Sequence, residues 1–397
     1  MDWRLRIDAH VDATIERLVA VRRRLHARPE PSCAEIETTR YLAELLRESG
    51  LKVAVPPSNR GVIVEPADGA AGSSLRVALR ADIDALRLQD EKQVPYRSQV
   101  DGVTHACGHD AHAACVVGAL LALHEARAAL PWPVPWRGVF QPAEESSDGG
   151  REMVAAGAVD GVRSIVALHV DPERATGRIG FRTGTLTAFC CEVDVVVRGR
   201  GGHAARPHHS ADPIAAACQF AGAVYQFVPR SVDSRDPSVV TFGSIHGGST
   251  QNVIPEEVRL RGTMRTHTAA AIATIEERMS AIAGGIAQAT GTNIELAFKR
   301  GPDAVINDPT VTRTCMESAA ELLGAEAIEH ISTPSMGGED FSEYLARVPG
   351  CLFRLGVAGG GHTKHFLHSP RFDLDETALA VGAKLLARCA VRLAAVE

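Results

Sequence analysis

The first half of this chain alternates short apolar runs with long helical patterns, and this alternation limits the possible folds more than any other feature. Residues 75–79, 138–141 and 164–168 are apolar runs of strand length, and residues 111–129 form an Ala- and Leu-rich helical stretch. Strands that alternate with helices are typical of an α/β core, in which helices cover the faces of a sheet. Further helical patterns cover residues 8–27, 34–49, 310–323 and 375–395.

The pattern changes near residue 185. From there to residue 299 the predicted elements follow in the order β-α-β-β-α-β, which is typical of a ferredoxin-like α+β module. A chain of 397 residues is also longer than a single core usually supports. We therefore expect an inserted domain at residues 185–299 and a discontinuous core domain of residues 1–184 and 300–397. The predicted strands of the insertion are 193–198, 238–245, 256–266 and 293–298, and its predicted helices are 212–228 and 268–290.

Charge and hydropathy restrict the partners of the chain. The net charge of −6 argues against nucleic acid or an anionic membrane as the main partner. No apolar run approaches the ~20 residues that span a bilayer, and the N-terminus lacks the apolar centre of a signal peptide. We expect a cytoplasmic protein, in which most of the nine irregularly spaced cysteines are reduced, buried thiols.

Residues 105–112 (HACGHDAH) hold three histidines, a cysteine and an aspartate, the densest group of metal-capable side chains in the sequence. Cys107 and His109 are separated by one residue in a predicted loop, and a thiolate with an imidazole suits zinc-like cations. The pair alone is weak evidence, because buried cysteines and helix-capping histidines are common. Cys107 could also serve as a nucleophile with a histidine base.

Further acids and histidines follow predicted strands. Asp84, the pair Glu144 and Glu145, and His169 each come just after a strand-like run, and His368 lies in a second histidine-rich loop. The carboxyl ends of strands in α/β sheets are where ligands gather, so these groups could share one rim. In extended backbone the paired carboxylates would point in opposite directions, one toward a metal and one available as a base. The alternative is a solvated acidic turn that caps a following helix.

Motifs over nearly the full length resemble those of the M20 metallopeptidase family, within the branch that includes hippurate hydrolases, N-acyl-amino-acid amidohydrolases and auxin-conjugate hydrolases. The combination is specific, although each motif alone is modest. The motifs are RLHARPE (24–30), LRADIDAL (79–86), HACGHD (105–110), FQPAEE (140–145), ALHV (167–170), GGHAARPH (201–208), NVIP (252–255), GTMRT (262–266), MGGEDF (336–341) and LHSP (367–370).

The resemblance implies a zinc-peptidase-like core with a mixed sheet that holds two divalent cations, such as zinc, manganese, cobalt or nickel. It makes Glu144 the general base, and it makes Asp84 an acid that orients a ligand imidazole. His105, Asp110 and His112 become supporting groups of the loop and the next helix. The implied ligands are Cys107, His109, Glu145, His169 and His368.

The insertion resembles the lid of that family, which also carries a homodimer contact. His203 matches a histidine that reaches the active site of the partner subunit and polarises the scissile carbonyl. Asn252 and Arg265 match positions near the substrate carboxylate, and a guanidinium suits bidentate carboxylate recognition. Arg87, Asp171 and Gly338 depart from the family pattern, and none of them is an implied ligand or base.

The expected activity is therefore metal-dependent hydrolysis of the amide bond of N-acyl amino acids or short peptide-like amides. A dipeptidase or carboxypeptidase of the same family is the nearest alternative. A thiol amidase built on Cys107 would leave Glu145, His169 and His368 without a role. A catalytically silent relative that binds small molecules would be expected to lack ligands or the base, whereas all of these positions are intact.

Overall fold

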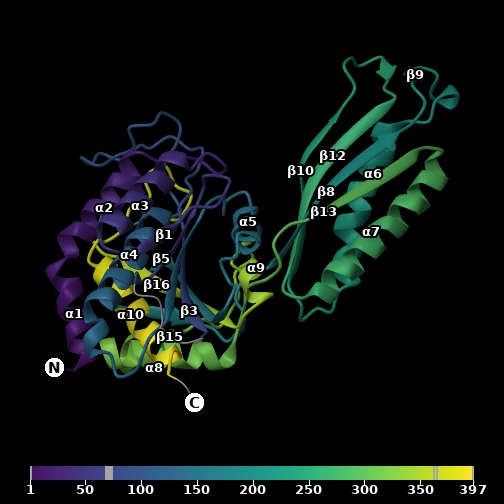
Figure 1. Cartoon of the computed structure of the whole chain (residues 1–397). Coiled ribbons are helices and arrows are strands. Elements are labelled where there is room, and N and C mark those ends of the chain that lie inside the picture. The colour runs from purple at the N-terminus through teal and green to yellow at the C-terminus, as the bar shows by residue number, and fades with distance from the viewer. Residues whose placement is uncertain (1, 68–74, 361–362, 364, 396–397) are drawn as a thin grey trace. The chain divides into compact units, whose positions relative to one another are not determined.

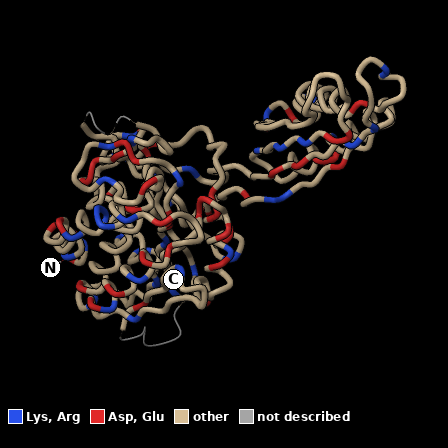
Figure 2. The backbone as a smooth tube through the Cα atoms, turned by 90° about the horizontal axis from the view of Figure 1, so that it is seen from above, with Lys and Arg blue, Asp and Glu red and all other residues tan. Residues whose placement is uncertain are grey.

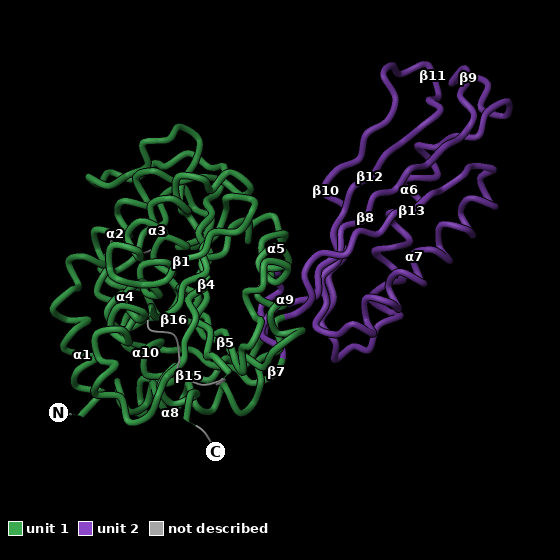
Figure 3. Tube along the Cα trace, in the orientation of Figure 1, with its two compact units in different colours: residues 1–184, 305–333, 340–397 green, residues 185–304, 334–339 purple. Residues whose placement is uncertain are grey.

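The computed structural model describes residues 2–67, 75–360, 363 and 365–395 (Figure 1). The chain divides into two compact units, drawn in different colours in Figure 3. The first unit comprises residues 1–184, 305–333 and 340–397, and the second comprises residues 185–304 and 334–339. The short segments 300–304 and 334–339, which we expected in the core domain, thus group with the insertion.

The first unit is built on an eight-stranded mixed sheet with the order β1-β2-β4-β3-β5-β16-β6-β15. Its centre is parallel, because β4, β3, β5 and β16 pair in the same direction, and β1 and β2 add antiparallel strands at one edge. The predicted α/β class with a mixed sheet is confirmed. The strands are β1 (Lys52–Ala54), β2 (Val62–Glu65), β3 (Arg76–Asp82), β4 (Trp136–Gln141), β5 (Val162–Ala175), β6 (Ile179–Phe181), β15 (Ile328–His330) and β16 (Gly350–Ala358).

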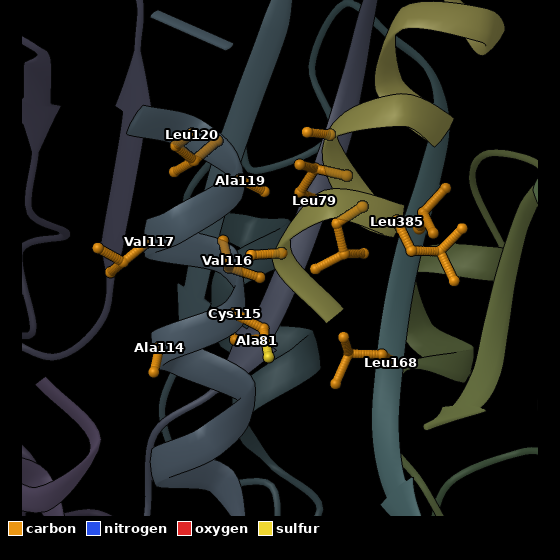
Figure 4. Close-up of a cluster of buried hydrophobic side chains, with 14 of the residues drawn as sticks. Leu79, Ala81, Ala114, Cys115, Val116, Val117, Ala119, Leu120, Leu168 and Leu385 are labelled. Carbon is orange, nitrogen blue, oxygen red and sulfur yellow. The ribbon is translucent and has the colours of Figure 1, made fainter. Parts of the chain in front are cut away.

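Helix α4 (His109–Ala126) runs through the centre of the first unit and is buried along almost its whole length. It packs against α1, α2, α10 and β3, and a helix that is apolar on all sides requires such burial. Figure 4 shows its side chains with those of β3, β5 and α10 in one apolar cluster. The other helices are α1 (Trp3–Ala13), α2 (Ile15–Ala27), α3 (Ile36–Glu48), α5 (Gly149–Ala155), α8 (Pro309–Leu323), α9 (Ser342–Leu345) and α10 (Ala378–Leu393).

The second unit is a four-stranded antiparallel sheet, ordered β10-β12-β8-β13, that packs against two helices over a separate apolar core. The chain order β8-α6-β10-β12-α7-β13 is the expected ferredoxin-like order. The side chains of Asp212 and Thr268 cap the two helices, as these residue types commonly do. The elements are β8 (Phe189–Arg198), α6 (Pro213–Phe227), β10 (Ser238–Gly247), β12 (Glu257–Thr266), α7 (Ala269–Thr290) and β13 (Asn293–Arg300).

Acidic and basic residues are interspersed along the chain, as Figure 2 shows. Among the residues that the structure describes, no helix has both the length and the apolar character needed to cross a membrane.

Candidate metal centre

A sharp turn at the start of α4 positions the side chains of residues 105–112. Gly108 precedes the helix with φ 86°, and a Cβ on it would lie 2.5 Å from Val170 Cγ2, so the backbone here requires glycine. Cys107 lies before this turn in a loop, as expected. His109 does not, because it is the first residue of α4. The helix therefore fixes the direction of the His109 ring.

His169 faces the thiol of Cys107. Its Nε2 lies 3.5 Å from Cys107 Sγ, and its Nδ1 donates to the carbonyl of Val170 at 2.8 Å. The second bond sets the tautomer and leaves Nε2 as an electron-pair donor toward the thiol. We expected His169 at the end of a strand, and that was wrong, because β5 continues to Ala175.

His109 connects a supporting carboxylate with the acidic pair. Its Nδ1 lies 3.1 Å from Asp84 Oδ1, and its Nε2 lies 3.8 Å from Glu144 Oε2 and 3.9 Å from Glu145 Oε1. In the described part of the chain, His109 Nε2 and Glu145 Oε1 are buried without a hydrogen-bond partner. The spacing is too long for hydrogen bonds, and these electron-pair donors converge on one space, which is an arrangement that suits a cation.

His368 completes the cluster from a distant segment. Its Nε2 lies 3.5 Å from Glu145 Oε1, and its backbone N–H donates to the carbonyl of Ala106 at 2.8 Å. His368 has φ 63°, a left-handed conformation that is costly for a residue with a Cβ and that occurs often at functional sites.

The potential ligand atoms form overlapping groups, and those of each group lie within 4.8 Å of one another. All five implied ligands belong to these groups, and Cys107, His109 and Glu145 each belong to two of the following three. Sulfur, imidazole nitrogen and carboxylate oxygen together suit zinc-like divalent cations, so the residues fit the implied metal. The groups are Cys107, His109 and His169; Cys107, Glu145 and His368; and His109, Glu144 and Glu145.

The acidic pair lies in a tight turn and not in extended backbone, so the expectation of opposed side chains was wrong. Both carboxylates face His109, and their side chains are only 11% and 14% exposed, respectively. Ala143 and Ser147 on either side have φ of 54° and 60°. The two carboxylates are thus largely shielded from solvent, and the shape of the turn brings them to the same space.

Burial shifts the pKa values of Cys107 and His169 toward their neutral forms. Burial raises the pKa of the Cys107 thiol well above its usual value, although His109 opposes this. Burial lowers the pKa of His169, and Arg354 and His112 lower it further. A neutral imidazole is ready to bind a cation, whereas the thiol loses its proton only when a positive charge is present.

Asp84 is held as an ionised acceptor. Burial alone would raise its pKa, but hydrogen bonds from His109 and Ser32 outweigh burial and lower the pKa below its ordinary value. Its second oxygen accepts from Ser32 Oγ at 2.7 Å and from the backbone N–H of Glu145 at 3.0 Å. Asp84 therefore links the His109 ring to the acidic turn.

Two other polar residues of the segment have structural partners. His112 Nδ1 lies 2.6 Å from Asp82 Oδ1, and its Nε2 accepts from the backbone N–H of Val170 at 3.0 Å. Asp110 accepts from the guanidinium of Arg22 at 3.0 Å and lies 2.7 Å from the ring of His26. Both nitrogens of His105 are buried without a partner among the described residues.

Sequence reasoning missed Glu35, a buried carboxyl next to this centre. Burial raises its pKa to about 7, and the nearby charge of Asp84 adds to the rise. Its Oε1 accepts from the backbone N–H of Ala143 at 2.8 Å. The only signal in the sequence is an acid at the start of a predicted helix, which would ordinarily indicate a cap.

The second unit holds the three remaining predicted residues. His203 in β9 (Gly202–His203) pairs with Val253 in β11 (Val253–Ile254), and the N–H of Ala204 donates to the carbonyl of Asn252 at 3.1 Å. His203 thus lies in a two-stranded ribbon, and Asn252 directly precedes the second strand of that ribbon. Arg265 lies in β12 of the four-stranded sheet and donates to the thiol of Cys190.

Gly338 has a physical reason within the second unit. A Cβ at this position would lie 2.7 Å from Cys190 Sγ and 3.1 Å from Arg265 Nη1. The departure from serine at Gly338 therefore leaves room for the contact between Cys190 and Arg265.

Comparisons with known proteins agree on one family. The family described as Peptidase family M20/M25/M40 matches residues 78–392. N-acetylcysteine deacetylase of Bacillus subtilis (strain 168) is 38% identical over 94% of this chain and 96% of its own length. IAA-amino acid hydrolase ILR1-like 4 of Arabidopsis thaliana is 34% identical over 94% of this chain and 85% of its own. The solved structure of Bacillus subtilis YXEP, described as a dinuclear metal binding peptidase from the M20 family, is 34% identical with a TM-score of 0.82 and covers 96% of this chain and 99% of its own.

Proposed function

The chain belongs to the M20/M25/M40 peptidase family, and from that premise we propose that it hydrolyses the amide bond of N-acyl amino acids with two divalent cations held in its first unit. It is a metal-dependent hydrolase of that family. The observation that carries the proposal is the set of overlapping donor groups, in which Cys107 joins one group with His169 and another with His368. Such a set can hold two adjacent cations with five ligands. The proposed ligands are Cys107, His109, Glu145, His169 and His368.

Glu144 is the proposed general base. The bound cations would polarise the scissile carbonyl and lower the pKa of water to about 7. Glu144 Oε2 faces the donor cluster beside His109 and can accept the proton of the attacking water. It then returns that proton to the leaving amine, a task for which one carboxylate is sufficient. Asp84 holds the His109 ring in place during these steps.

The substrate class follows from the relatives. One is described as a deacetylase of N-acetylcysteine and another as a hydrolase of IAA-amino acids, so an acyl group on an amino acid is common to both. Dipeptides and peptides with a free carboxyl end are the second candidate, because the family also contains peptidases.

We assign the recognition of the substrate carboxylate to the second unit. Arg265 supplies a guanidinium and Asn252 an amide, and both suit a carboxylate. His203, an exposed imidazole on the β9–β11 ribbon, would polarise the scissile carbonyl in a neighbouring subunit. This role requires a homodimer through the second unit, which we propose as a lid, and a cytoplasmic location completes the proposal.

A substrate screen tests this function. Metal-free protein is reconstituted with zinc, manganese, cobalt or nickel and is assayed on N-acyl amino acids and dipeptides. We expect turnover of acyl amino acids that a chelator abolishes and that added cation restores. Turnover that survives the chelator but is lost on thiol alkylation would instead support Cys107 as a nucleophile. Binding of ligands without turnover across the whole panel would support a silent relative.

A further inference from the structure

Glu35 is a fully buried carboxyl that the proposed chemistry does not use. It occupies the position before α3, but the structure gives it no capping bond to that helix among the described residues. Its Oε1 instead accepts two backbone N–H groups, from Cys33 at 3.0 Å and from Ala143 at 2.8 Å. A buried acid is costly, so its retention requires a compensating contact.

Ala143 is the residue from which the acidic turn departs. Its φ of 54° is left-handed, a conformation that is costly for an L-residue. Its carbonyl accepts from the N–H groups of Gly149 at 3.1 Å and Asp148 at 3.3 Å, which closes the turn. The bond from Ala143 N–H to Glu35 holds the other side of the same residue. The strained conformation is therefore fixed from both sides.

A second buried carboxyl holds the turn two residues later. Asp84 Oδ2 accepts the N–H of Glu145 at 3.0 Å. The backbone at Ala143 and at Glu145 is thus bound by carboxyls from two separate segments, and Glu144 lies between these anchor points. Without Glu35, Asp84 alone of these two carboxyls would hold the backbone beside the proposed base.

We infer that Glu35 is a positioning residue that acts through the Ala143 N–H to aim the carboxylates of Glu144 and Glu145 at the donor cluster. The expected effect of Glu35 on turnover rests on the proposed function, whereas its expected effect on the structure of the acidic turn does not. Glu35 Oε1 is the atom that performs this role, since it accepts the Ala143 N–H. Glu35 Oε2 has no hydrogen-bond partner among the described residues.

The competing role for Glu35 is a structural ion pair. Arg60 Nη1 lies 3.7 Å from Glu35 Oε2, and Arg60 Nη2 is engaged by Glu152 at 2.7 Å. In that role the charge of Glu35 would matter and its reach to Ala143 would not. As a positioning residue, Glu35 should tolerate replacement by an amide of the same length but not by a shorter acid. As an ion-pair partner, it should tolerate the shorter acid but not the amide.

Two variants and a matched control separate these roles. Glu35→Gln keeps the length and the acceptor oxygen but removes the charge, and Glu35→Asp keeps the charge but shortens the side chain by one methylene. Glu30→Asp is the control, because Glu30 lies in the same segment and accepts two backbone N–H groups, those of Glu37 and Thr38 in α3. It makes the same shortening at a carboxyl that does not contact the acidic turn.

Amide hydrogen exchange of the metal-free protein is the first readout. We expect faster exchange of residues 143–149 in Glu35→Asp and exchange close to wild type in Glu35→Gln and in Glu30→Asp. Cobalt affinity, measured by chelator competition, should fall about tenfold in Glu35→Asp alone, because Glu145 is displaced. Neither readout requires turnover, so they test the inference even if the proposed substrate class is wrong.

Kinetics form the second readout once a substrate is known. We expect kcat to fall roughly 10–100-fold in Glu35→Asp with KM within about twofold, because misplacing a base by about 1 Å costs rate more than binding. Glu35→Gln should retain kcat within about threefold. The inference is overturned if Glu35→Asp exchanges and turns over like wild type. It is equally overturned if Glu35→Gln loses as much as Glu35→Asp, or if Glu30→Asp does.

Discussion

Glu144 and Glu145 are neighbours in sequence, but their atoms have different surroundings. The backbone N–H of Glu145 donates to Asp84, and Glu145 Oε1 lies between His109 and His368. Glu144 Oε2 lies 3.8 Å from His109 Nε2. The position of Glu145 between two imidazoles suits a ligand, and that of Glu144 suits a base at the margin of the cluster.

We predict that Glu144→Gln abolishes turnover while cation binding persists. The amide cannot take a proton from water, and loss of a general base typically costs 10²–10⁴-fold in rate. Turnover and bound metal, measured on the same preparation, check this. Glu145→Gln is the comparison, and it should lose cation affinity as well as rate. If the Glu144→Gln variant remained active, Glu144 would not be the general base.

At the residue scale, the family motifs predicted the members of the cluster but not their local geometry. Cys107, His109, Glu145, His169 and His368 do lie in overlapping donor groups, although their roles as ligands stay a prediction. The turn at 143–148 was mispredicted as extended, because its conformation depends on bonds from Glu35 and Asp84, which are distant in sequence. No local pattern encodes such contacts.

At the scale of elements, α4 is held by close packing. A Cβ on Gly118 would lie 2.6 Å from Leu18 Cδ1 in α2 and 2.9 Å from Ala383 Cβ in α10. The two neighbouring helices therefore approach the backbone of α4 closely at this residue. Protein interiors are close-packed, so there is no free space for an added methyl group.

We predict that Gly118→Ala destabilises the protein although alanine favours helices. Overpacking costs roughly 1–3 kcal/mol, which exceeds the gain of about 1 kcal/mol in helix propensity. Gly285→Ala in α7 is the control, because a Cβ there meets nothing within 4 Å and should stabilise. Urea unfolding of both variants checks the opposite signs. If Gly118→Ala were instead more stable than wild type, α2 and α10 would be able to move apart without loss of stability.

A second contact between elements joins α2 to the segment before α10. Arg22, fully buried, pairs with Asp110 at 3.0 Å, Asp373 at 2.7 Å and Glu376 at 3.0 Å. Burial would raise the pKa of Asp373, but Arg22 outweighs burial, together with hydrogen bonds from Leu374 and Tyr96, and lowers the pKa below 3.8. The ionised form is therefore favoured in the folded state.

We predict that Asp373→Asn lowers the free energy of unfolding by about 3 kcal/mol at pH 7, because it leaves the buried Arg22 charge undercompensated. The stabilisation by Asp373 is complete above pH 3.8 and is lost as the pH falls toward its lower folded pKa. The difference between wild type and variant should therefore shrink below about pH 3.8. Urea unfolding of metal-free protein between pH 7 and pH 3 measures it. A constant difference over that range would contradict the role of the carboxylate charge.

Element prediction succeeded where the sequence pattern was long and periodic. The four-stranded sheet and the two helices of the second unit, and helices α4, α8 and α10, were predicted to within a few residues. The short strands β1, β2, β6 and β15 carry too few residues for a period to appear. The sequence of β16 (GCLFRLGVA) is apolar except for Arg354 and could belong to a strand or a helix. The central position of β16 follows only from its pairing with β5.

At the scale of the whole molecule, the donor cluster belongs to one unit but to distant parts of the chain. Its members come from the segments around residues 107, 144, 169 and 368, which only the folded first unit brings together. The predicted family is confirmed by the match over residues 78–392. Because the cluster exists only in the folded state, cation binding must stabilise that state.

We predict that a divalent cation at 100 times its Kd raises the free energy of unfolding by about 2.7 kcal/mol for each site that it fills. Thermal unfolding with cation and with chelator measures the shift in Tm. His169→Ala, which removes one proposed ligand, should reduce the shift. Equal Tm values with cation and with chelator would mean that the folded cluster does not bind the ion.

The most direct test of the central claim is a titration of metal-free protein with cobalt or manganese while hydrolysis of an N-acyl amino acid is followed. The proposed centre predicts no turnover in chelator and a rise in turnover that saturates at about two cations per chain, since five donors in overlapping groups suit two ions. Full turnover by the metal-free protein in the presence of chelator would contradict it.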